Sequence, residues 1–127
     1  MNDNDTLTET LVELVEILPE GAEHPVNVQT IATRLNTNKR SVTAWVAFLI
    51  NHWGVPIGSR RNSPSGYYLI TNDEERNETI APLTAQALEE LKRAEKLRLI
   101  DLESWRDDFE KKQGMNNHAG TNQSSDY

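Results

Sequence analysis

The apolar residues of the first 50 positions recur at the spacing of a helix, and this pattern constrains the fold most. In three separate segments they return every three or four positions, which places them on one helical face. The three stripes comprise Leu11, Leu14, Val15 and Leu18, then Val28, Ile31, Ala32 and Leu35, and finally Val42, Trp45, Val46, Leu49 and Ile50. The sequence therefore predicts three short helices that share one core.

Residues at the ends of these segments support their bounds. Thr6-x-x-Glu9 has the form of a capping box, and the first helix is expected to stop at Pro19. Asn27 is placed to cap the second helix. In the polar interruption 36–38, either asparagine is suited to a left-handed conformation or to capping the next helix. We expect the third helix to run from about residue 39 to 53, with Gly54 as its C-terminal glycine.

The periodicity changes after Gly54 to that of an extended hairpin. Residues 55–59 and 66–71 are the expected strands, and residues 60–65 the polar turn. Val26 is expected to add a strand of one or two residues. The predicted fold class is thus mainly α with a small antiparallel β-ribbon.

A long charged segment follows the hairpin. Asn72-x-x-Glu75 is expected to open a helix that breaks or restarts at Pro82. Residues 84–112 are predicted to form one long amphipathic helix, supported by opposite charges four positions apart. We expect its apolar stripe to join two copies of the chain, the alternative being that it folds back over the first helix. The stripe consists of Leu88, Leu91, Leu99, Leu102, Trp105 and Phe109.

These elements suggest four parts. Residues 6–76 form the expected domain and residues 77–112 a helical dimerisation arm. Residues 1–5 and 113–127 have little to bury and are expected to be disordered.

Charge is segregated along the chain. Residues 24–71 hold five basic residues and no acidic one, a charge of +5, whereas the remainder holds eight basic and all 20 acidic residues, a charge of −12. The net charge of −7 would argue against nucleic acid, but phosphates respond to a local field that salt screens beyond about 8–10 Å. Residues 24–71 are therefore the expected functional region.

Composition argues against several function classes. No run reaches the ~20 apolar residues of a membrane span, and the acidic N-terminus is unlike a secretory signal. The absence of cysteine suits a cytoplasmic protein without a thiolate metal site. His24, His52 and His118 lie far apart, so we expect no metal and no cofactor. The sequence holds no catalytic triad, phosphate-binding glycine loop or paired carboxylates, and we do not expect an enzyme.

The order of helix, helix, tight turn, helix and ribbon resembles a winged helix-turn-helix. Residues 31–46 resemble its helix-turn-helix, with Ala32 as the small residue that lets two helices approach. Gly54-Val-Pro-Ile57 and Gly66-Tyr-Tyr-Leu69 resemble the wing of the biotin-operon-repressor type and of small phage-type DNA-binding proteins. The resemblance covers residues 7–75. This chain departs from the family in having Asn36 for the usual turn glycine and Thr37 for the usual apolar residue.

The resemblance implies a transcriptional regulator that binds double-stranded DNA as a homodimer. The third helix would enter the major groove, with Arg40 on a guanine, Lys39 on a phosphate, and Thr43 and Ala44 near a thymine methyl. Backbone amides at the helix start would also hold phosphates. The remaining expected contacts, to phosphates or the minor groove, are Asn38, Ser41, Ser59, Arg60, Arg61 and Asn62.

Other interpretations remain open at this point. The two basic pairs could simply be solvated surface. Trp45, Trp53, Tyr67 and Tyr68 are better explained by core packing than by base stacking, with Trp45 and one tyrosine facing inward and the other tyrosine outward. The main rival function is a winged-helix adaptor or inhibitor that contacts a protein through its acidic helices, because the fold alone does not decide.

Overall fold

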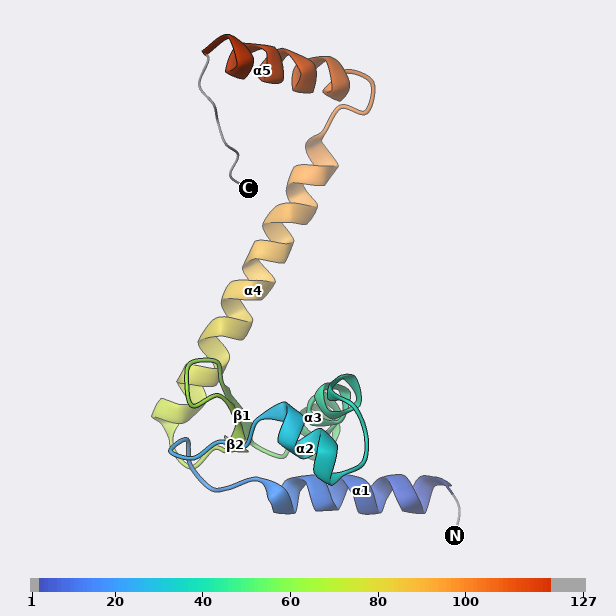
Figure 1. Cartoon of the computed structure of the whole chain (residues 1–127), viewed down its shortest axis with the longest axis vertical. Coiled ribbons are helices and arrows are strands. Elements are labelled where there is room, and N and C mark those ends of the chain that lie inside the picture. The colour runs from blue at the N-terminus through green and yellow to red at the C-terminus, as the bar shows by residue number, and fades with distance from the viewer. Residues whose placement is uncertain (1–2, 120–127) are drawn as a thin grey trace. The chain divides into compact units, whose positions relative to one another are not determined.

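The computed structural model describes residues 3–119, and the side chains of residues 5–114. This part is mainly helical and contains one two-stranded antiparallel sheet (Figure 1). The elements are α1 (Asp3–Ile17), α2 (Val28–Arg34), α3 (Lys39–Trp53), β1 (Ile57–Arg60), β2 (Gly66–Leu69), α4 (Asp73–Leu99) and α5 (Trp105–Ala119). They form two compact units that divide between Ala85 and Gln86. None of the described helices has the length and apolar character needed to cross a bilayer.

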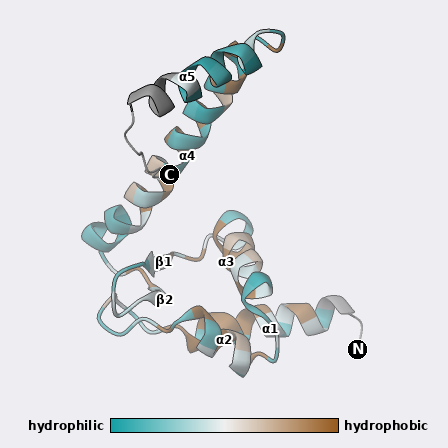
Figure 2. Ribbon diagram, turned by 45° about the horizontal axis from the view of Figure 1, so that its top comes forward, coloured by the Kyte–Doolittle hydropathy of each residue, from teal (hydrophilic) through white to brown (hydrophobic). Residues whose placement is uncertain are grey.

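The core of the first unit lies between α1, α2, α3 and β1. Its buried members are Leu11, Leu14, Leu18, Ile31, Ala32, Val42, Val46, Leu49 and Ile57. Figure 2 shows hydrophobic residues concentrated on α1 and α2, whereas α5 is mostly hydrophilic. The predicted stripes are confirmed except at the end of α3, where Ile50 remains 40% exposed. Trp45 is partly buried and packs against this core.

A tight turn fixes α3 against α2. Asn36 adopts a left-handed conformation with φ of 56°. The Thr37 amide donates to the Ala32 carbonyl at 2.8 Å, and the Asn36 amide donates to the Thr33 carbonyl at 3.2 Å. These two bonds form a Schellman motif, so asparagine fills the position where glycine is usual. Asn38 then caps α3 by accepting from the Ser41 amide at 2.8 Å.

Strand β2 is hydrogen-bonded along both of its edges. β2 pairs with β1 in the register Gly58 to Tyr68, and its other edge bonds to the loop that follows α1. The amides of Tyr67 and Leu69 donate to the carbonyls of Val26 and Pro19, each at 2.8 Å. The expected short strand at Val26 is therefore confirmed as an isolated bridge to Tyr67.

Tyr68 joins the ribbon to the start of α4. Its side chain is completely buried, and its ring lies over Gly58, where an added Cβ would come within 2.5 Å of Cζ. Its hydroxyl lies 3.4 Å from Thr79 Oγ1, and Thr79 Oγ1 also accepts from the Ser59 amide at 3.2 Å. One tyrosine was predicted to face inward and the other outward. Tyr68 is buried because α4 lies on the second face of the ribbon, whereas Tyr67 is partly buried and packs against the core. Through these bonds the first turns of α4 belong to the first unit, which extends to Ala85.

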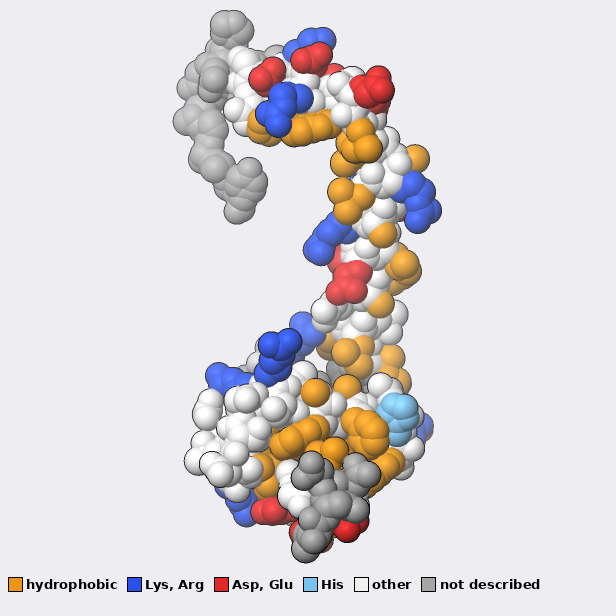
Figure 3. All heavy atoms as spheres, turned by 90° about the vertical axis from the view of Figure 1, so that its right-hand side faces the viewer, with side chains coloured by type: hydrophobic (Ala, Val, Ile, Leu, Met, Phe, Trp, Pro, Cys, Tyr) orange, Lys and Arg blue, Asp and Glu red, His pale blue; other side chains and the backbone are white. Residues whose placement is uncertain are grey.

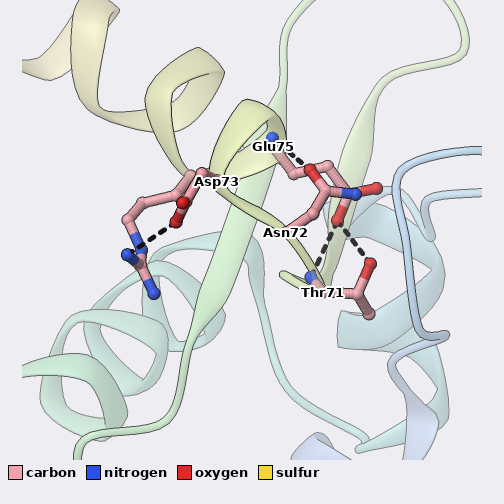
Figure 4. A network of polar contacts seen from close by, with 5 residues as sticks. Thr71, Asn72, Asp73 and Glu75 are labelled. Carbon is pink, nitrogen blue, oxygen red and sulfur yellow. Dashed lines mark hydrogen bonds and ion pairs between the residues drawn. The ribbon is translucent and has the colours of Figure 1, made fainter.

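A glutamate at the start of α4 connects three segments of the chain. Glu75 accepts from the Thr71 amide at 2.8 Å and the Thr71 hydroxyl at 3.0 Å, as Figure 4 shows. It also accepts from the Ala22 amide at 2.9 Å. The amides of Thr71 and then of Ala22 hold the pKa of the Glu75 carboxyl below its ordinary value. Asn72 caps α4 by accepting from the Glu75 amide, so the predicted opening of this helix is confirmed.

The predicted helix 84–112 differs from the structure in two respects. α4 continues through Pro82 without a break, and the helix instead ends at Leu99. Asp101 explains this end, because its carboxylate accepts from the Glu103 amide at 2.8 Å in a turn that competes with helical bonding. The Asp101 carbonyl then accepts from the Trp105 amide, where α5 begins.

The chain ends also differ from the prediction of disorder. Asp3–Asp5 belong to α1, which therefore begins before the expected capping box at residue 6. Residues 113–119 belong to α5. Residues 1–2 and 120–127 lie outside the described residues.

We expect Gly58→Ala to destabilise the first unit, because the new methyl group meets the buried Tyr68 ring. The cost should be about 1–3 kcal/mol, as for other overpacked sites, and thermal unfolding measures it. Gly114→Ala is the matched control, because an added Cβ there has open space, and its melting temperature should be unchanged or slightly higher. Equal melting temperatures for wild type and Gly58→Ala would contradict this account.

We also expect a pH-dependent contribution from Glu75. Because its folded-state pKa is lowered, the carboxylate stabilises the fold above the ordinary glutamate pKa of about 4.3, and this stability is lost as the pH falls through the lowered value. In denaturant unfolding, Glu75→Gln should therefore be less stable than wild type at pH 7, and the difference should shrink towards pH 3. Glu74→Gln, its exposed neighbour, is the control and should show little difference at either pH.

Candidate nucleic-acid interface

The first turns of α3 expose the side chains that the sequence assigns to a groove. Val42 and Val46 of this helix are buried in the core. Arg40 is exposed on the side opposite Val42, and Lys39 is exposed beside it at the start of the helix, with Thr43 and Ala44 also exposed one turn later. The core therefore determines which face of α3 is presented outward.

A hollow of about 360 Å³ lies between this face and the hairpin. Its lining residues come from the start of α2, from α3 and from the ribbon, and they are Asn27, Val28, Thr43, Ser59, Arg60, Arg61, Ser65, Gly66 and Tyr67. Lys39 and Arg40 precede Thr43 by four and three positions, so all three share one face of α3. Thr43 and the hairpin arginines thus border one concave surface, and Lys39 and Arg40 lie one turn earlier on α3.

Two neighbouring arginines of the hairpin have different surroundings. Arg60 is the last residue of β1 and not part of the turn as predicted, because its backbone pairs with Gly66. Its Nη1 donates to the Ala22 carbonyl at 3.1 Å. Arg61 and Asn62 are exposed in the turn itself. Arg61 is therefore the better placed of the two arginines to reach a ligand over the hollow.

Carboxylates flank the hairpin on the side of α4. Arg60 borders a second hollow of about 260 Å³ together with Glu23, Glu74, Glu75 and Glu78. Glu78 also lines a third hollow beside Arg61. Among residues 5–114, the ion pairs within 4 Å join Arg76 to Asp73, Lys92 to Glu89 and Arg98 to Glu95. Lys39, Arg40 and Arg61 take part in none of these pairs, so their charges face solvent.

Some polar groups of the candidate DNA-binding residues already form hydrogen bonds within the first unit. The Asn38 carboxamide oxygen caps α3, which leaves its NH2 group as the donor for a phosphate. Ser41 and Ser59 are half-buried, and the backbone amide of each is bonded within the first unit. Their hydroxyls are the groups that remain to contact a ligand.

The structure adds lining residues that sequence reasoning did not assign. Asn27, Val28, Ser65, Gly66 and Tyr67 border the hollow with the predicted residues. Gly66 has φ of 143° and lies so close to the Val26 backbone that no side chain fits. Gly66 in the predicted second strand is the sequence feature that could have indicated this close approach of two backbones.

The far end of α3 carries an exposed aromatic group. The Phe48 ring lies 4.7 Å from the His52 ring and 5.8 Å from the Trp53 ring, centroid to centroid. Trp53 is 45% exposed, so it does not belong to the core as predicted. Figure 3 shows hydrophobic side chains over one face of the first unit, with basic side chains gathered along its edge.

All six predicted dimerisation residues are exposed in the second unit. Leu99, Leu102, Trp105 and Phe109 line one groove, whereas Leu88 and Leu91 lie earlier on α4.

Within the described residues, no group of three or more His, Cys, Asp or Glu side chains is arranged to hold a metal ion. In comparisons with known proteins, the chain matches no family model, no curated protein and no solved structure.

Proposed function

We propose that this protein binds double-stranded DNA as a winged helix-turn-helix and acts as a transcriptional regulator. In this proposal α3 enters the major groove and the β1–β2 hairpin is the wing. One observation carries it: Thr43 of α3 and Arg61 of the hairpin line one hollow, with Lys39 and Arg40 on the same face of α3.

The charge distribution supports a phosphate-rich partner. The first unit has an acidic excess overall, but the surface around the hollow combines three solvent-facing cations with hydroxyl and amide donors. Charged and neutral donors of this kind hold phosphates and set the position of a protein on a duplex. Glu78 on the α4 side would repel a phosphate, so the backbone should approach from the side of α3.

Base reading would depend on few side chains. Arg40 has the geometry for two bonds to the edge of a guanine, and Lys39 suits a phosphate. Thr43 offers a methyl group and a hydroxyl, while Ala44 and Ala47 offer only methyl contacts. We therefore infer modest sequence specificity, with affinity supplied mainly by phosphate contacts.

The adaptor function remains as a second candidate because of the far end of α3. Phe48, Ile50 and Trp53 are each about two-fifths exposed there, and exposed apolar groups of this kind are typical of protein contacts. An adaptor using this end would not need Lys39, Arg40 or Arg61. The two candidates therefore respond to different substitutions.

We expect binding to random duplex DNA to be strongly salt-dependent. With contacts from Lys39, Arg40 and Arg61, the slope of log affinity against log salt should be about −3 for each first unit engaged. Gel-shift or fluorescence-anisotropy titrations between 50 and 200 mM salt, values at which counterion release is readily measured, provide the test. A flat dependence, or no binding at the lower salt, would refute the DNA proposal and favour the adaptor.

Single substitutions should separate the two hairpin arginines. We expect Arg40→Ala and Arg61→Ala each to weaken duplex binding about 5- to 20-fold, and Arg60→Ala to have a smaller effect because its guanidinium bonds to Ala22. Arg76→Ala removes the same charge from a residue paired with Asp73 and is the matched control. Melting temperatures should stay near wild type for all four. Equal losses for Arg61→Ala and Arg76→Ala would indicate only a general charge effect.

A further inference from the structure

The second unit exposes a large apolar surface that its own residues do not cover. Eight large apolar side chains between Gln86 and Gly114 are at least 41% exposed, and Leu102 reaches 81%. They are Leu88, Leu91, Leu97, Leu99, Ile100, Leu102, Trp105 and Phe109. Figure 3 shows hydrophobic side chains running along this part of α4 and along α5. So much exposed apolar surface on so short a segment indicates a contact site.

The centre of this surface is a groove of about 670 Å³ where α4 turns into α5. Apolar side chains from both sides of the turn line it, with Asp101, Asp108 and Lys112 at its polar positions. The Trp105 and Phe109 rings lie 6.4 Å apart on one face of α5. The Arg106 guanidinium lies 4.5 Å from the centre of the Trp105 ring and limits where that ring can move.

The turn itself prepares the groove for binding. Asp101 accepts from the Glu103 amide, and its carbonyl accepts from the Trp105 amide, so residues 101–105 are bonded to one another. The Ile100 amide donates to the Leu97 carbonyl and ends α4. Because these bonds hold the turn before a partner arrives, less conformational entropy is lost on association.

Charge and area both indicate what covers the groove. Residues 86–114 hold seven basic and eight acidic residues, a charge of only −1, whereas residues 1–85 hold six basic and eleven acidic, a charge of −5. Two copies of this nearly neutral surface can therefore meet without strong repulsion. Its eight large apolar side chains are 41–81% exposed and are available for an interface, of which a standard example takes about 800 Å² from each partner.

We propose that a second copy of this chain covers the groove, and that the two copies meet through a two-fold axis. In such an interface the same patch serves both copies. Trp105 and Phe109 of each copy fill the groove of the other copy and pack there against its Leu99 and Leu102. The Glu95–Arg98 pair interrupts the apolar stripe on α4, but it is neutral as a pair at 3.3 Å. This assignment replaces the single long amphipathic helix expected from the sequence with an interface formed by the end of α4, the turn and α5.

Sedimentation of the full chain and of single variants tests the proposal independently of DNA. Wild type should be dimeric at micromolar concentration, and Leu102→Glu and Trp105→Ala should each raise the dissociation constant at least about tenfold. Leu102 lies in the turn and is almost fully exposed, so its substitution should leave the helical circular dichroism unchanged. Trp105→Ala provides a second variant without an added charge.

Trp53→Ala is the matched control, because Trp53 has similar exposure at the end of α3, 45% against 41% for Trp105. It should leave the dimer intact. A wild type that stays monomeric at about 1 mM, the range of weak association, would overturn the proposal. So would a dimer that Trp53→Ala disrupts and the two groove variants do not. The DNA proposal is tested separately. It stands, whatever sedimentation shows, if a monomeric Leu102→Glu variant binds duplex DNA with an unchanged salt slope for each first unit.

Discussion

The burial of Tyr68 is the interaction on which the arrangement of the first unit depends. Its ring needs the bare backbone of Gly58 on one side and the first turns of α4 on the other. Thr79 bonds both to the tyrosine hydroxyl and to the Ser59 amide, so α4 covers the ribbon face and the edge of β1 together. The hairpin is therefore held at its base, and the position of Arg61 beside α3 follows from the packing of a residue seven positions away.

Features determined by neighbours in the sequence were predicted well. The three apolar stripes, the caps Asn27 and Asn38 and the bounds of α3 all appear in the structure, because helix periodicity and capping depend on a few adjacent residues. The turn at Asn36 was also predictable, since asparagine tolerates the left-handed backbone that the Schellman motif requires. The position of Thr43 and the hairpin residues around one hollow depended on long-range packing in addition to local pattern.

Features determined by distant contacts were missed. The direction of Arg60 depends on the alternation of β1 and on the Ala22 carbonyl, 38 positions earlier in the chain. The cover that α4 gives the ribbon depends on Thr79, a residue without any distinctive pattern around it. The end of α4 at Leu99 depends on whether the Asp101 side chain accepts from the Glu103 amide or leaves the backbone free to continue the helix. The amphipathic stripe is compatible with either outcome.

The division into two units gives the proposed activities different physical bases. The first unit has three solvent-facing cations and a helix with few hydrogen-bonding groups, so one copy alone should hold DNA weakly and with modest specificity. The second unit is nearly neutral and offers apolar area instead. Two weak contacts joined by a stable interface gain an effective concentration that neither has alone, and geometry then selects half-sites at one spacing. Specificity that α3 cannot supply through base contacts would in this way arise from the distance between two copies.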